Sequence, residues 1–369
     1  MMRSYVCTRW GLPSALSLQE TDVPPPPPGK GEVAIAVHAC AVNFPDVLIV
    51  QGKYQLKPKF PFVPGGEVAG VVTDVGEGCT RFRVGDRVVA FVGIGGFATD
   101  LVAKETKVSP LLAGMDFYTA SSFLVVYGTA DYALRVRAKI KSGDLVLILG
   151  ASGGVGLAAV QLAKAAGATV IAAASTAEKL RACRESGADL LLNYREGVGG
   201  KGGGGREGAS SRDSDGRDWR SALKRLTKGK GVDVVVDNVG GSDCEIAMRS
   251  LAVDGRYLVI GFASGAIPSP PLNIVLLKEA CVMGVFWGQW VERHPEESAK
   301  QMEELVRLYR RGLVRPFVSR VYPLEDTPRA LEDMEARRVV GKVVIGIRSP
   351  SAQSDSSTSS SSPSLQSRL

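Results

Sequence analysis

The sequence has few side chains of the kinds that bind catalytic metals. It contains two histidines, His38 within an expected strand and His294 directly before a proline. Its six cysteines are dispersed, without a CxxC pair: Cys7, Cys40, Cys79, Cys183, Cys244 and Cys281. A catalytic zinc site uses about three protein ligands, and disulfide frameworks show characteristic cysteine spacings. We therefore expect neither a metal site nor disulfides, and a reducing compartment.

Long apolar segments are also lacking. No uninterrupted run approaches the roughly 20 residues that cross a bilayer, and the opening MMRSYVCTRWG has neither a signal-peptide core nor transit-peptide character. The formal charge of +7 comes from basic residues interleaved with acids, without an arginine-rich run alternating with aromatics. We therefore expect no membrane partner and disfavour nucleic acid, whereas a mildly basic surface suits a small anionic ligand.

Two segments are poor in apolar residues and are expected to be disordered. Residues 197–217 are glycine-rich and are interpreted as a surface insertion, and residues 349–369 form a serine-rich tail. The tail ends in Ser367, Arg368 and Leu369, which has the form of a peroxisomal address. The sequence thus leaves two locations open: the peroxisome, reached through its import receptor, or the cytoplasm if the tail is inert.

The remaining chain is long enough, at 369 residues and 45% hydrophobic, to bury two cores. Residues 1–126 contain short strands punctuated by glycines, including 32–39 and 68–75, and predict a β-rich, partly barrel-like domain. Residues 268–348 are expected to return to this domain, with a helix at 295–312 and a strand at 339–347.

Residues 127–267 alternate strands with helices, which predicts a doubly wound parallel sheet and an α/β fold. The expected strands begin at Leu145 and continue with 169–173, 190–193, 232–237 and 256–261, and the expected helices are 155–166, 177–186 and 219–227.

The stretch from Leu145 to Gly156, LVLILGASGGVG, is the clearest functional signal. An apolar strand breaks into glycines and then into a helical pattern, so backbone N–H groups at the helix N-terminus are available to an anion. The spacing departs from the common GxGxxG pattern, but its strand and helix context predicts a dinucleotide site.

The end of the second strand indicates which dinucleotide binds. A site for NAD usually places Asp or Glu there to bind the ribose 2′-hydroxyl. This chain instead has Ser175, followed by Lys179, where a 2′-phosphate would lie. NADPH is therefore the expected cofactor, the alternative being that Lys179 only solvates a helix face.

Several separated motifs resemble one family. In the first domain these are NFPD at 43–46, GKY at 52–54 and PGGE at 64–67. The glycine turn is followed by NYR at 193–195, DNVG at 237–240, IGF at 260–262 and GKV at 341–343. Together they resemble the zinc-free quinone oxidoreductase (zeta-crystallin-like) branch of the medium-chain dehydrogenase/reductases. The resemblance implies a Rossmann domain for 127–267 and a GroES-like catalytic domain for the flanking segments.

The resemblance also accounts for the lack of metal ligands. Zinc-dependent relatives carry a ligand cysteine where this chain has Asn43 and a ligand histidine where it has Gly66. Without a Lewis acid, we expect hydride transfer to an acceptor that is already polarised by conjugation.

The resemblance implies a set of site residues. Asn43 and Tyr54 are the expected catalytic residues; Tyr54 either donates a proton to the reduced acceptor or forms a stacking wall. Some relatives have a second tyrosine where this chain has Leu48, so a two-tyrosine mechanism is in doubt. The expected cofactor contacts are Asn43, Tyr54, Thr129, Gly153, Gly154, Val155, Gly156, Ser175, Lys179, Tyr194, Asn238, Gly261, Phe262, Phe286 and Lys342. Phe91, Trp287 and Trp290 either shape an apolar cleft or pack in the core.

The predicted function is NADPH-dependent, zinc-independent hydride transfer to quinones. The resemblance also implies a homodimer that forms through an edge strand of the nucleotide domain. Reduction of α,β-unsaturated carbonyls, such as alkenals or enoyl groups, is the alternative within the same enzyme class. A non-enzymatic, crystallin-like protein that binds NADPH or RNA is the alternative of another class.

Overall fold

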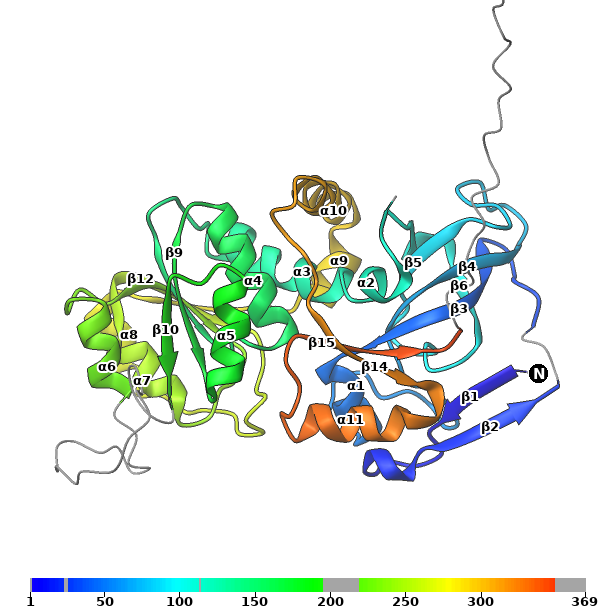
Figure 1. Ribbon diagram of the computed structural model, residues 1–369, viewed down its shortest axis with the longest axis horizontal. Helices are drawn as coiled ribbons and strands as arrows, with labels where there is room; N and C mark the ends of the chain where they lie inside the picture. The colour runs from blue at the N-terminus through cyan, green and yellow to red at the C-terminus, as the bar shows by residue number, and fades with distance from the viewer. Residues whose placement is uncertain (1, 23–25, 113, 195–218, 349–369) are drawn as a thin grey trace, which may run out of the picture.

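The computed structural model describes residues 2–22, 26–112, 114–194 and 219–348. Two lobes lie side by side, one built on a parallel sheet and the other rich in antiparallel strands (Figure 1). The helices between them are α3 (Leu124–Asp131), α9 (Trp287–Arg293) and α10 (Pro295–Arg310). The predicted insertion at 197–217 and the tail with Ser367, Arg368 and Leu369 lie outside the described residues.

The parallel sheet has six strands in the order β10-β9-β8-β11-β12-β13. Every neighbouring pair is parallel. Counted along the chain this is the order 3-2-1-4-5-6 of a dinucleotide-binding Rossmann sheet. The strands are β8 (Leu145–Leu149), β9 (Thr169–Ala174), β10 (Leu190–Asn193), β11 (Val232–Asp237), β12 (Leu251–Val259) and β13 (Cys281–Gly284).

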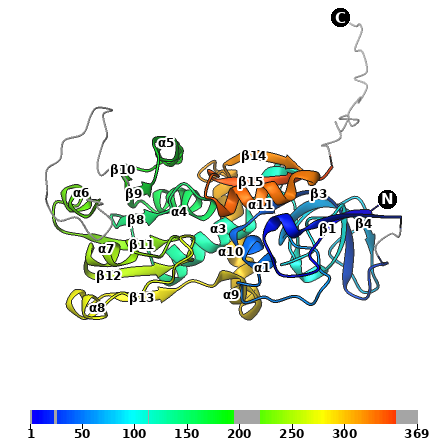
Figure 2. The same cartoon turned by 90° about the horizontal axis from the view of Figure 1, so that it is seen from below.

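Helices cover both faces of this sheet, which is why β8 is apolar throughout. Val146 and Ile148 pack in the same core as α4, whereas Leu147 and Leu149 pack in a second core with Trp219. Successive side chains of a strand point to opposite faces, so one apolar strand supplies both cores. Figure 2 shows α4 and α5 on one side of the sheet and α7 and α8 on the other. These helices are α4 (Gly154–Ala165), α5 (Ala177–Glu185), α6 (Trp219–Leu226), α7 (Asp243–Arg249) and α8 (Asn273–Lys278).

The second lobe contains a sheet in the order β14-β15-β3-β4-β5-β7, with β6 also paired to β3. The C-terminal strand β15 pairs antiparallel with β3, so the end of the described chain completes a sheet begun near its start. The strands are β3 (Glu32–Val42), β4 (Glu67–Val75), β5 (Arg87–Phe91), β6 (Asp100–Lys104), β7 (Val108–Pro110), β14 (Val318–Pro323) and β15 (Lys342–Gly346).

Short elements complete this lobe. A separate hairpin joins β1 (Met2–Val6) to β2 (Ser17–Thr21). The helices are α1 (Phe44–Val50), α2 (Phe117–Ser121) and α11 (Thr327–Glu335), and 3-10 turns occur at Pro13–Ala15, Glu105–Lys107 and Leu324–Asp326. After α3 the chain continues as a π-helix over Tyr132–Arg137.

The structure departs from the sequence-based expectations mainly at boundaries. The expected limit between residues 126 and 127 falls inside α3, and β13 continues the parallel sheet beyond residue 267. This edge strand is only four residues long and is largely exposed. The strand expected at 256–261 is instead β12, which begins at Leu251 and passes through a left-handed residue, Asp254. Among the described residues, no helix is long and apolar enough to cross a membrane.

Candidate active site

The glycine turn lies between β8 and α4, and each glycine has its own reason to be there. Gly153 is the N-cap of α4, where the described residues provide no side-chain cap. A Cβ at Gly156 would lie 2.4 Å from the carbonyl oxygen of Gly150, so only glycine permits this turn. The N–H groups of a first helical turn have no acceptor within the helix, so those of Val155 and Gly156 are placed to meet an anionic ligand, whereas Gly153 and Gly341 form an isolated parallel bridge.

Gly154 has a different role, because it contacts the other lobe. A Cβ at this position would lie 2.7 Å from Cδ of Lys342 and 2.9 Å from Cγ1 of Val126. Next to it, Gly341 donates its N–H to the carbonyl oxygen of Ser152 at 2.7 Å. The glycine turn therefore packs directly on the start of β15, and the two lobes meet at this point.

Asn238 follows β11 at the position where the strand order reverses. Its Nδ2 donates to the carbonyl oxygen of Leu149 at 2.9 Å, which joins the carboxyl ends of β8 and β11. Its Oδ1 is buried and has no hydrogen-bond partner in the described part of the chain. A crevice at this reversal is where open α/β sheets bind ligands, and an unpaired buried acceptor there fits a ligand that donates a hydrogen bond.

Phe262 and Phe286 lie on the segments that follow β12 and β13. Phe262 packs against Gly240, where a Cβ would lie 2.8 Å from its ring. Phe286 is 44% exposed, an unusual fraction for a large apolar side chain. Gly261 precedes Phe262 and donates its N–H to the carbonyl oxygen of Asp237 at 3.4 Å. These residues therefore follow the carboxyl ends of the strands, as the resemblance implies.

Ser175 and Tyr194 follow two neighbouring strands of the parallel sheet. Ser175 comes directly after β9, and Tyr194 comes directly after β10, which pairs with β9. Lys179 lies in the first turn of α5, and its Nζ donates to the carbonyl oxygen of Arg337 at 2.7 Å. Arg337 itself donates from its guanidinium to the carbonyl oxygen of Ser264 at 3.0 Å.

Arg337 therefore lies beside the predicted 2′-phosphate residue Lys179, and the sequence analysis did not include it. It lies directly after α11 in a left-handed conformation, with φ of 56°. It connects the second lobe to the first turn of α5 and to the loop after β12, and no local motif marks it in the sequence.

A buried polar network surrounds Asn43 at the junction of the two lobes. Lys342 donates from Nζ to Oδ1 of Asn43 at 2.6 Å and to the carbonyl oxygen of Val42 at 3.0 Å. Asn43 donates from Nδ2 to Oε2 of Glu67 at 3.1 Å. Lysine only donates and an ionised carboxylate only accepts, so the orientation of the Asn43 amide is unambiguous.

Glu67 is the counter-charge of Lys342. Its Oε2 lies 3.8 Å from the lysine Nζ, and its Oε1 accepts from the N–H of Val125 at 3.0 Å, in the first turn of α3. Both side chains are buried, at 0% exposure for Glu67 and 3% for Lys342. The lysine expected as a cofactor contact thus directs its ammonium into the protein, towards Asn43 and Glu67.

Burial shifts the pKa values of these groups. Burial lowers the pKa of Lys342, although the Glu67 charge opposes this. Burial also raises the pKa of Glu67, against the effect of Lys342 and of the N–H groups that it accepts from. The pKa of Asp46 rises to about 7 because burial outweighs the stabilising N–H of Asn43 and the Lys342 charge.

Asp46 also connects the two positions that hold zinc ligands in the zinc-dependent relatives. Its carboxylate accepts from the N–H of Asn43 at 2.7 Å and interacts with the backbone of Gly66. A Cβ at Gly66 would lie 3.0 Å from the carbonyl oxygen of Gly93, so this position has little room for a side chain. Within the described ranges, no group of three His, Cys, Asp or Glu side chains is placed to hold a metal ion.

Tyr54 follows α1 and is half-buried. Burial and the neighbouring Asp46 charge raise the pKa of its hydroxyl, which therefore stays protonated at neutral pH. This hydroxyl makes no hydrogen bond to another described residue, so it is available to a ligand.

The aromatic residues divide between the core and the site. Trp287 and Trp290 are only 6% and 7% exposed, which supports core packing over a cleft lining. Phe91 is half-buried and packs on Trp287 with ring centroids 5.5 Å apart. Thr129 is half-buried on α3, next to the residue on which Trp287 packs.

Comparisons with known proteins agree with this geometry. Residues 29–113 match the alcohol dehydrogenase GroES-like domain, and residues 154–307 match the zinc-binding dehydrogenase family. The chain is 34% identical over 347 residues to rat quinone oxidoreductase-like protein 2, covering 94% of this chain and 92% of that protein. The chain belongs to the zinc-free quinone oxidoreductase branch of the medium-chain dehydrogenase/reductases.

Other members and solved structures support the same assignment. Rat quinone oxidoreductase is 30% identical over 94% of this chain and 98% of its own length. The structure of Escherichia coli quinone oxidoreductase complexed with NADPH has a TM-score of 0.82 and 30% identity, covering 94% of this chain and 100% of that chain. The predicted family, and the predicted pairing of a Rossmann with a GroES-like domain, are confirmed.

Removing the buried lysine charge is expected to destabilise the fold. Lys342→Met leaves Glu67 buried without its counter-charge, so the free energy of unfolding should fall by about 3–5 kcal/mol in urea titrations. The double variant Lys342→Met/Glu67→Gln should lose less than the sum of the two single variants, by about 1–3 kcal/mol. The half-exposed pair Lys164–Asp189, with Nζ and Oδ1 2.8 Å apart, provides the control: Lys164→Met should cost less than about 1 kcal/mol. If the losses of the two single variants simply added in the double variant, this would contradict the pairing of Lys342 with Glu67.

The raised pKa of Asp46 predicts a specific dependence of stability on pH. Between its ordinary value of 3.8 and its folded value of about 7, the folded protein retains a proton that the unfolded chain releases. Stability from this group therefore falls as pH rises through that window. Asp46→Asn removes the titration, so its unfolding free energy relative to wild type should improve by about 2 kcal/mol from pH 5 to pH 8. Asp74→Asn, which replaces an exposed carboxylate, is the control, and a pH-independent difference for Asp46→Asn would refute the assignment.

Proposed function

We propose that the protein is an NADPH-dependent, zinc-independent oxidoreductase that transfers hydride to quinones. The observation that carries the proposal is the Asn43 amide, held by Lys342 and Glu67 beside the glycine turn, where zinc-dependent relatives have a ligand cysteine. An amide and a buried ammonium paired to a carboxylate supply no Lewis acid to a carbonyl. The acceptor must then be electrophilic through its own conjugation, as a quinone is.

The residues present fit the cofactor. The uncapped first turn of α4 suits a pyrophosphate, and the unpaired Oδ1 of Asn238 suits a donor group of the ligand. In this proposal Ser175, Lys179 and Tyr194 hold the 2′-phosphate, with Arg337 beside them. Asn43, Tyr54, Thr129, Gly261, Phe262 and Phe286 surround the nicotinamide. When bound, NADPH supplies the hydride.

Proton supply completes the reaction. A quinone that accepts a hydride gains two electrons and needs one further proton to become a hydroquinone. Tyr54 has a protonated, unpaired hydroxyl and is proposed to donate this proton, or to position the water that does.

The decisive experiment measures NADPH oxidation with ortho- and para-quinones and, in parallel, with enals and enoyl thioesters. We expect kcat/KM to be highest for a quinone. The structure of the CurK enoyl reductase, at a TM-score of 0.78 and 26% identity, favours double-bond reduction as the second candidate. A preference for enals or enoyl thioesters would select that candidate, and NADPH binding without turnover of any acceptor would contradict an enzymatic role.

Cofactor choice is expected to depend on Lys179. A charged hydrogen bond contributes about 1.5–3 kcal/mol, so Lys179→Ala should weaken NADPH binding by about 10- to 100-fold in fluorescence titrations. NADH lacks the phosphate, and its affinity should change by less than about twofold. Lys164→Ala, a lysine on α4 paired to Asp189, is the matched control. Equal weakening of both dinucleotides by Lys179→Ala would refute the phosphate assignment.

We also propose a homodimer that forms through the edge strand β13. This strand ends the parallel sheet, and nearby apolar side chains are exposed, at 75% for Leu272, 76% for Leu276 and 48% for Val282. An exposed strand edge beside apolar side chains favours pairing with a second sheet. Leu276→Glu should shift the protein from dimer to monomer in sedimentation experiments, and a wild-type monomer would overturn the proposal.

The C-terminal tripeptide is proposed to direct the protein to peroxisomes through the import receptor. Removing residues 367–369 from a fluorescent fusion should move it from peroxisomes to the cytoplasm, whereas an unchanged distribution would favour an inert tail.

A further inference from the structure

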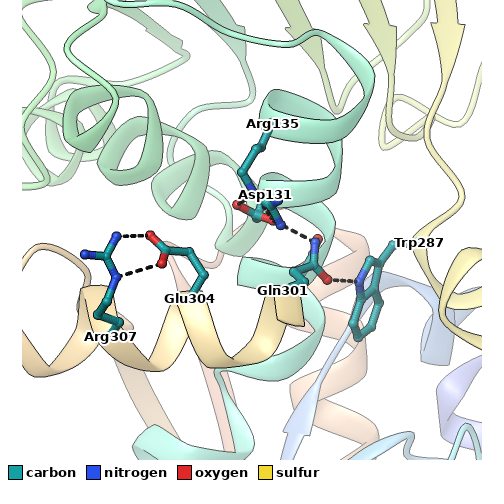
Figure 3. A network of polar contacts seen from close by, with 7 residues as sticks. Asp131, Arg135, Trp287, Gln301, Glu304 and Arg307 are labelled. Atoms are coloured by element: carbon teal, nitrogen blue, oxygen red, sulfur yellow. Dashed lines mark hydrogen bonds and ion pairs between the residues drawn. The ribbon is translucent and has the colours of Figure 1, made fainter. Parts of the chain in front are cut away.

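Gln301 is a fully buried polar residue on α10, at 0% exposure, and its side chain connects three helices. Its Oε1 accepts from the indole Nε1 of Trp287 on α9 at 2.8 Å. Its Nε2 donates to Oδ2 of Asp131 on α3 at 2.8 Å (Figure 3). The same Nε2 donates to the carbonyl oxygen of Gly128, also on α3, at 3.1 Å. One amide thus joins α9 and α3 through α10.

The chemistry of the partners fixes the orientation of this amide. An indole N–H can only donate, whereas a carbonyl and an ionised carboxylate can only accept. Asp131 is itself held by Arg135 one turn later, through contacts of 3.0 Å from Nε to Oδ1 and 2.8 Å from the terminal nitrogen to Oδ2. Both N–H groups of Gln301 are therefore used, and rotating the amide would break all three hydrogen bonds.

Packing contacts hold the indole of Trp287 in addition to its hydrogen bond. A Cβ at Gly128 would lie 2.4 Å from Cζ2 of the indole, so the ring lies directly on the backbone of α3. Phe91 contacts the ring from β5, with centroids 5.5 Å apart. The position of Trp287 is thus set by Gln301, Gly128 and Phe91 together, and little freedom remains for α9 relative to α3.

The residues adjacent to these contacts are proposed to face the nicotinamide. Phe286 immediately precedes Trp287, and Thr129 immediately follows Gly128. The hydrogen bonds of Gln301 therefore set the spacing between the segments that carry Phe286 and Thr129, although Gln301 contacts neither residue in these hydrogen bonds.

We propose that Gln301 is a positioning residue for hydride transfer, which holds Phe286 and Thr129 at the nicotinamide through Trp287 and Gly128. The proposal rests on the proposed function. The proposed pyrophosphate and 2′-phosphate contacts lie on α4, α5 and the loops after β9 and β10, and none of them takes part in the hydrogen bonds of Gln301. Loss of Gln301 should therefore reduce the rate of hydride transfer while dinucleotide affinity is retained.

The test compares two variants that disturb the network from opposite sides. Gln301→Met keeps the side-chain volume and removes the hydrogen bonds, and Gly128→Ala displaces Trp287 directly. Leu305→Val, on the same helix and also 0% exposed, is the control for loss of packing alone. For each protein, kcat, the acceptor KM and the NADPH dissociation constant are measured, with the isotope effect of NADPH deuterated at the transferred position.

Both network variants should lower kcat by about tenfold or more, since a displacement of about 1 Å can cost 100-fold. Their NADPH dissociation constants should change by less than about twofold, and the isotope effect should increase as hydride transfer becomes rate-limiting. Unchanged kcat in both variants, an equal loss of NADPH affinity, or the same kcat loss in Leu305→Val would overturn the proposal.

A second readout uses the protein without cofactor. Acrylamide quenching of tryptophan fluorescence should increase in Gln301→Met, and Trp287→Phe in that background should remove the increase. Unchanged quenching in Gln301→Met would contradict the link to Trp287. Because this measurement needs no turnover, it remains decisive if the wild-type protein reduces no acceptor, an outcome that would instead reject the proposed function.

Discussion

The buried charge of Lys342 is the constraint on which the junction of the two domains depends. An ammonium at 3% exposure is tolerated only with a counter-charge and hydrogen-bond acceptors around it. The chain supplies these from the end of β3, from α1 and from the start of β4, and Glu67 in turn binds the first turn of α3. Four segments distant in sequence are thereby fixed around the Asn43 amide, and the proposed chemistry takes place beside them.

Local patterns predicted much of the fold and part of the site. The strands at 190–193 and 232–237 agree with β10 and β11 to the residue, since buried parallel strands have continuous apolar runs bounded by turn residues. The glycine turn was recognisable because an apolar strand breaks into glycines there and a helical pattern follows. The edge strand β13 was missed although its sequence is apolar, because a short apolar run does not by itself distinguish an exposed edge strand from other structure.

Contacts between distant segments were beyond prediction from local patterns. Nothing near Gly154 indicates that its lack of a side chain accommodates a lysine 188 positions away. Gln301 is an ordinary residue of α10 and Arg337 follows α11, and only the folded arrangement gives them their partners. The motifs PGGE and NFPD contained Glu67 and Asp46, but their importance depends on burial, which the motifs do not reveal. The sequence left open whether Trp287 and Trp290 line a cleft or pack in the core. Their low exposure supports core packing.

The contact between the glycine turn and β15 also bears on how the domains can move. Residues 152–154 are joined to 341–342 by a backbone hydrogen bond and by the stem of Lys342 lying on a glycine. Separating them would expose a buried ion pair to water, so this point resists opening. Any rotation of one domain against the other would therefore be centred near this contact, with the largest displacements at the loops farthest away. Under the proposed function the pyrophosphate binds at this contact, so a dinucleotide would keep its central anchor during such a rotation while the acceptor exchanged.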